Sequence, residues 1–151
     1  FATQEDVFAV AEKVMYDTFT TFSDLPVSKP PFRRIPFKEA MLKYGSDKPD
    51  LPISLRLHEV TDIVENSAFK VFSGVKSLHN GKVVAMCVPG AAQLPRSEID
   101  SYTEFVKIYG AKGLAYIKVN ELARGREGLQ SPIVKNLSDE ELNGILTRVG
   151  A

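Results

Sequence analysis

The sequence predicts an α+β fold, in which an antiparallel sheet carries helices on one face and follows a helical segment and a proline-rich linker. From Ile53 onward, short alternations and helical periodicities succeed one another in the order strand, helix, strand, strand, helix, strand. That order is typical of a split βαβ arrangement with its helices on one face. The pair Asn80–Gly81, common in hairpin turns, stands directly before an apolar run over Lys82–Val88 that predicts a central strand.

The part of the chain before this pattern predicts a helix and a linker. Thr3 and Asp6 resemble a capping box with aspartate in place of glutamate. Apolar residues then recur at helical spacing, which predicts a helix over about Gln4–Phe22. Its apolar stripe is wide, so we expect it to pack against a large surface. Prolines recur between Ser23 and Pro36 and indicate an extended linker.

The segment Tyr44–Leu51, of sequence YGSDKPDL and called the seam below, joins this part to the rest. Gly45 is expected to end a short helix in a left-handed conformation, and Pro49 prevents the helix from restarting. The seam therefore exposes charged side chains on a stiff backbone. We expect residues 1–52 to form one segment and residues 53–151 to form a separate domain.

Individual elements of the second part follow from local signals. Strands are predicted at Leu55–Leu57, Phe69–Phe72, Lys82–Val88 and Leu114–Val119. Helices are predicted after the capping residues Thr61, Ser97 and Ser138. A mobile charged loop is expected over Glu121–Gln130.

Charge balance, cysteine content and hydropathy disfavour several classes of protein. The 151 residues hold 19 Lys and Arg against 19 Asp and Glu, which disfavours a strongly basic nucleic-acid binder but allows a local basic patch. The single cysteine, Cys87, excludes an internal disulfide, and its apolar neighbours predict a buried, inert thiol. No apolar run reaches membrane-spanning length, so we expect no membrane partner and a cytoplasmic location.

Several long strings resemble one protein family. EAMLKYGSDKPDL (Glu39–Leu51) is similar to bacterial-type aspartyl-tRNA synthetases just before the large insertion in their catalytic domain. FKVFSGV, VVAMCVPGAA, EIDSYTEFVKIYGAKGLAYIKVNE and LQSPIVKNLSDEEL follow in the same order and resemble that insertion, the GAD domain. The resemblance covers essentially the whole chain and agrees with the α+β class.

The resemblance implies a fragment of an aspartate–tRNA ligase, a class II synthetase that is a homodimer, uses ATP and Mg²⁺, and acts on the tRNA for aspartate. The arginines that hold ATP in this family would lie outside residues 1–151. The resemblance therefore assigns no catalytic residue here, and we expect the fragment to bind neither cofactor and to be inactive alone. It places Asp47, Lys48 and Asp50 at the rim of the active site.

The same resemblance suggests a supporting role near the tRNA acceptor arm. Basic residues of the linker, the seam and the charged loops are the candidate phosphate contacts. They are Arg33, Arg34, Lys48, Lys112, Arg124 and Arg126. Solvated surface charge is the simpler interpretation for each of them.

The sequence departs from the family at one point. Leu51 is followed by Pro52–Ile53–Ser54, where related synthetases continue with an arginine. Either two residues are missing at this position or the arginine is truly absent, and the agreement on both sides favours the first explanation. A true absence would remove support for a role of the seam at an active-site rim.

A second function remains open. GAD domains also occur in subunits of tRNA-dependent amidotransferases, where this chain would be a structural or protein-interaction module without RNA contact. The seam favours the synthetase, whereas the zero net charge favours the structural role.

Overall fold

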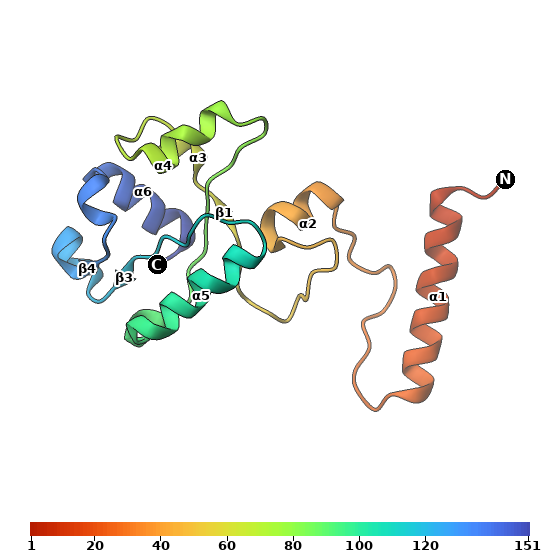
Figure 1. Cartoon of the computed structure of the whole chain (residues 1–151). Coiled ribbons are helices and arrows are strands. Elements are labelled where there is room, and N and C mark those ends of the chain that lie inside the picture. Colours follow the sequence, from red (N-terminus) through yellow and green to blue (C-terminus); the bar gives the residue numbers. More distant parts are fainter. The chain divides into compact units, whose positions relative to one another are not determined.

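The computed structural model describes residues 1–151 and divides them into two compact units, Phe1–Pro36 and Phe37–Ala151. Figure 1 shows the elements of both units in sequence colours. The second unit already includes the seam and the helix before it. The predicted boundary after residue 52 separates a segment of a larger catalytic domain from an inserted domain. The division into compact units does not test that boundary, so it stays a prediction.

The first unit consists of α1 (Gln4–Phe22) and an extended segment. The capping box is confirmed: the Thr3 hydroxyl accepts from the Asp6 amide, and the Asp6 carboxylate accepts from the Thr3 amide. No residue of α1 is buried, and its apolar side chains are exposed, with Val10 at 64% and Phe22 at 84%. The helix thus has the wide apolar face that the sequence predicts.

The second unit is α+β, as predicted, but its strands form two small antiparallel sheets instead of one. β1 (His58–Glu59) pairs with β2 (Val84–Ala85), and β3 (Lys118–Val119) pairs with β4 (Leu129–Gln130). The Lys82–Val88 run is therefore not a central strand, because β2 pairs on one edge only. Cys87 in this run is partly exposed and not fully buried as predicted.

The predicted strand at Phe69–Phe72 is wrong, since these residues enter α4 (Lys70–Ser73). The rings of Phe69 and Phe72 lie 5.0 Å apart, edge to face, and both pack on the main core. A spacing of three residues puts both rings on the same side of a helical turn, whereas alternation in a strand would send them to opposite faces. Tertiary packing therefore outweighs the β propensity of this segment.

The remaining helices lie where the sequence predicts them, but two of them are not capped by the predicted residues. They are α2 (Phe37–Tyr44), α3 (Thr61–Val64), α5 (Arg96–Ile108) and α6 (Asp139–Val149). Ser138 caps α6 through a full capping box with Glu141. Thr61 does not cap α3: its hydroxyl accepts from the Val83 amide at 3.0 Å, so it links α3 to the segment before β2. Pro95, not Ser97, is the N-cap of α5.

The core lies where α6 and the turn before it meet α4. Val134, Leu137 and Leu142 are buried there, and Phe69, Phe72 and Ile117 pack against them. A second buried pair, Val60 and Val64, lies at α3. Arg148 on α6 holds α3 through two bonds to the Asp62 carboxylate, at 2.9 and 3.1 Å. No helix of the structure combines the length and the apolar character that a membrane span requires.

Candidate functional site

The seam forms one wall of an open pocket of about 260 Å³ in the second unit. Gly45 ends α2 with φ +69°, a left-handed conformation that confirms its predicted role. The Lys48 amide then donates to the Ser46 hydroxyl at 3.0 Å, which closes a tight turn before Pro49. The pocket is lined by Tyr44, Ser46, Lys48, Pro49, Asp50, Ile53 and Leu55.

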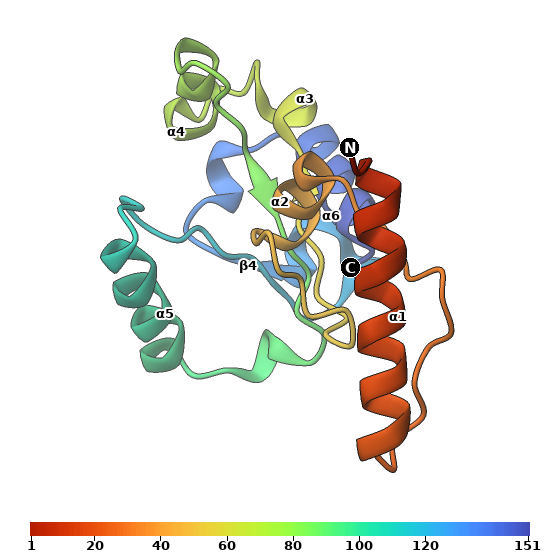
Figure 2. The same ribbon diagram turned by 90° about the vertical axis from the view of Figure 1, so that its right-hand side faces the viewer.

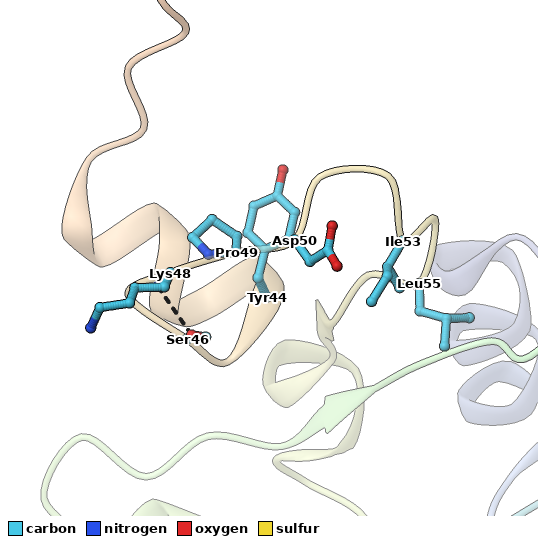
Figure 3. Close-up of a pocket in the computed structure, with 7 residues that line it drawn as sticks. All are labelled: Tyr44, Ser46, Lys48, Pro49, Asp50, Ile53 and Leu55. Carbon is cyan, nitrogen blue, oxygen red and sulfur yellow. Dashed lines mark hydrogen bonds between the residues drawn. The ribbon is translucent and has the colours of Figure 1, made fainter. Parts of the chain in front are cut away.

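Figure 3 shows how these side chains lie. The ring of Tyr44 and the carboxylate of Asp50 point to the same side of the seam, whereas the amine of Lys48 extends away from them. Ile53 and Leu55 form an apolar side of the pocket. The pocket therefore offers an aromatic face, a carboxylate and aliphatic surface, with a lysine at its edge.

Arg56 lies next to this pocket and contacts residues on two sides of it, and no local sequence pattern predicts this. Its guanidinium lies over the Tyr44 ring, 4.5 Å from the ring centre, a cation–π geometry. It also donates to the carbonyls of Leu51, Ile53 and Leu55. Arg56 thus fixes the connection after the seam against α2. In sequence it was only the polar member of a short alternation, because its contact with Tyr44 depends on tertiary folding.

The contact with Leu51 bears on the departure from the family pattern. The synthetases that the seam resembles would continue with an arginine directly after Leu51, whereas this chain carries Pro52 there. The structure nevertheless places a guanidinium, that of Arg56, within 3.3 Å of the Leu51 carbonyl. The loop therefore contains an arginine, although from a later position in the chain.

The three predicted rim residues lie together at the seam. Asp47 and Lys48 form an ion pair of 3.2 Å, with 56% and 87% of their side chains exposed. Asp50 is exposed and lines the pocket. Such an exposed pair contributes little to stability. These charges are therefore accessible to a partner.

The two arginines of the linker differ in their surroundings. Arg34 pairs with Glu5 at 2.7 Å and lies over the ring of Phe8 at 4.5 Å. The hydrogen bond to Glu5 raises the pKa of the Arg34 guanidinium. Arg33 is exposed and forms no ion pair. Of the two, only Arg33 presents an uncompensated charge.

The candidate phosphate contacts Arg124 and Arg126 also differ in their bonding partners. Arg126 donates to the carbonyls of Val134 and Leu137 at 2.6 and 2.7 Å and to the Asp139 carboxylate at 2.8 Å. Arg124 lies within ion-pair distance of Glu121 and Glu127, at 3.8 and 3.4 Å.

Lys112 is exposed and forms no ion pair. Within the segment expected to be a mobile loop, Leu122–Gly128 instead forms 3-10 turns on either side of a kink at Gly125, where φ is +55°. The structure therefore leaves Arg33 and Lys112 as unpaired cations and uses Arg126 internally.

Titratable side chains do not gather into a metal site. No group of three or more His, Cys, Asp or Glu residues has a geometry that could hold a metal ion. His58 lies on β1 and His79 in an exposed turn.

A sequence-family model described as "GAD domain" matches residues 72–151. The chain belongs to the GAD domain family. The match spans just over half of the chain and includes both β2 and α6. The resemblance to a GAD domain is thereby confirmed. The seam and its pocket lie before the matched residues, so their assignment rests on the synthetase-like string EAMLKYGSDKPDL.

Proposed function

We propose that this chain is part of a bacterial-type aspartate–tRNA ligase and that its GAD domain supports the acceptor arm of the tRNA. One observation carries the proposal: the string YGSDKPDL stands shortly before a matched GAD domain. That combination favours a synthetase over an amidotransferase subunit. The proposed parent is a cytoplasmic homodimer that activates aspartate with ATP and Mg²⁺ and transfers it to tRNA.

Under this proposal the chain provides a surface that contacts tRNA and no catalytic residue. Arg33 and Lys112 are the candidate cations without an ion pair, and Lys48 is 87% exposed but pairs with Asp47. The other candidates are compensated by carboxylates or carbonyls. Each phosphate contact at an exposed site stabilises a complex by about 1 kcal/mol or less. Binding by the isolated chain is therefore weak, and the supporting role depends on the remainder of the enzyme.

The test is a titration of the chain with aspartate-accepting tRNA at low and at physiological salt, with an unrelated tRNA as control. We expect saturable binding that prefers the cognate tRNA and weakens with salt. Lys112→Gln should lower the slope of log K against log salt by about 1. Arg124→Gln is the matched control, and its effect should be smaller because carboxylates already surround that guanidinium.

The alternative function is a structural or protein-interaction module without RNA contact, as in amidotransferase subunits. The balanced charge and the internal use of Arg126 favour it. Equal and weak binding of both tRNAs, unchanged by Lys112→Gln, would refute the acceptor-arm role and leave this alternative.

A further inference from the structure

The pocket at the seam, called the seam pocket below, holds polar groups that have no partner within the chain. The Asp50 carboxylate and the Tyr44 hydroxyl line this pocket and form no hydrogen bond or ion pair. The Ser46 hydroxyl accepts from the Lys48 amide, which leaves its own proton free to donate. A few polar groups that converge beside apolar and aromatic surface are the usual make-up of a ligand site.

The size and the walls of the seam pocket fit one flat ring system. Its volume of about 260 Å³ lies just below the range of about 300–1,000 Å³ that is typical for larger organic ligands. The Arg56 guanidinium covers one face of the Tyr44 ring, and Arg56 does not line the pocket. We therefore place a flat ligand on the other face of this ring, with Ile53 and Leu55 as its aliphatic wall.

We propose that the seam pocket binds the guanine base of a nucleotide. A carboxylate only accepts hydrogen bonds, and its two oxygens suit two adjacent N–H groups. Guanine presents such a pair on its Watson–Crick edge, namely N1–H and the N2 amino group. Its O6 atom stands next to N1–H and can accept from the Ser46 hydroxyl. Guanine thus satisfies Asp50 and Ser46 together while its ring stacks on Tyr44.

Other planar donors fit the Asp50 carboxylate less well. Adenine and cytosine each carry one amino group beside a ring nitrogen that accepts, and uracil carries one N–H between two carbonyl oxygens. A carboxylate would face one of these acceptors and lose one of its two bonds. An arginine side chain has paired donors, but it offers no acceptor to the Ser46 hydroxyl and no phosphate to Lys48. The donor pattern therefore selects guanine.

Lys48 provides a cation for the phosphate of the nucleotide. It is the only cation among the residues that line the seam pocket, and its amine extends outward in Figure 3. A phosphate can replace its weak, exposed pair with Asp47. Free guanosine 5′-monophosphate and an unpaired guanosine of RNA offer the same base and phosphate. The inference does not rest on the proposed function, because the pocket lies before the matched residues 72–151 and requires no tRNA.

Titration of the full chain with guanosine 5′-monophosphate, followed by nuclear magnetic resonance, tests the site. We expect saturable shifts of the Tyr44 ring signals and a Kd at least about 5-fold lower than for adenosine 5′-monophosphate. Asp50→Asn should abolish this preference and leave the fold intact, because Asp50 is exposed and has no partner. Asp100→Asn is the matched control and should preserve it, since Asp100 belongs to α5, which stands apart from α2 in Figure 2.

A single-stranded oligouridine with one central guanosine distinguishes the two sources of the base. Tighter binding of this strand than of the mononucleotide assigns the site to RNA, whereas equal or weaker binding assigns it to the free nucleotide. Equal affinity for the two mononucleotides, or an unchanged preference in Asp50→Asn, would overturn the proposal. Methylguanidinium that binds at the Tyr44 ring as tightly as guanosine 5′-monophosphate would assign the pocket to an arginine side chain of a partner protein, which also overturns it.

Discussion

Arg126 gives the sharpest prediction, because sequence and structure assign it different roles. The sequence places it among exposed phosphate contacts, whereas the structure shows its guanidinium bonded to the carbonyls of Val134 and Leu137. Both residues belong to the main core, at 9% and 3% exposure. Arg126→Ala should therefore reduce the stability of the second unit rather than act only on RNA binding.

The magnitude follows from the bonds that are lost. Each carbonyl bond contributes about 1 kcal/mol net. The bond to Asp139, whose side chain is 69% exposed, adds between about 0 and 1 kcal/mol. Arg126→Ala should thus lower the free energy of unfolding by about 2 kcal/mol. Arg126→Lys should recover less than half of this loss, since one ammonium cannot reproduce the planar fork.

Urea unfolding followed by far-ultraviolet circular dichroism measures this change. Arg124→Ala is the matched control on the same 3-10 segment and should change stability by less than about 0.5 kcal/mol. Equal small effects of the two alanine variants would refute the structural role of Arg126. A loss of tRNA binding by Arg126→Ala without any loss of stability would restore it as a direct contact.

Three further predictions concern the packing of α6. Leu142→Ala should cost about 2–5 kcal/mol, because the side chain is 2% exposed in the core and leaves a cavity; thermal unfolding measures it, and a loss below about 1 kcal/mol would contradict the packing. Ser138→Ala removes the capping box with Glu141 and should cost about 1 kcal/mol, whereas Ser138→Asp should retain most of the stability. The hydrogen bonds from Arg148 hold the pKa of the Asp62 carboxyl below its ordinary value of 3.8, so their contribution is present above that pH and is lost as the pH falls through the lowered pKa. Asp62→Asn should flatten the acid limb of the stability curve below pH 4, and an unchanged curve would show that the pair does not couple to folding.

Local chemistry made much of the chain predictable. The capping boxes at Thr3 and Ser138 and the left-handed Gly45 appear in the structure where the sequence placed them. These features depend on residues within a few positions of one another. For the same reason the positions of α1 and α6 followed from periodicity.

Contacts between distant residues decided the rest. Phe69 and Phe72 have strand-forming side chains, but burial of both rings on one core requires a helical turn. The contact of Arg56 with the Tyr44 ring joins residues that meet only after folding. Arg126 is likewise not a free cation, because it bonds to carbonyls that only the folded turn presents. The sequence by itself determined the α+β class, the N-terminal caps of α1 and α6, the end of α2 at Gly45 and the charged seam, since caps and turns are short-range. Only the tertiary structure decided which charges remain free and which strands pair, because both depend on residues that meet after folding.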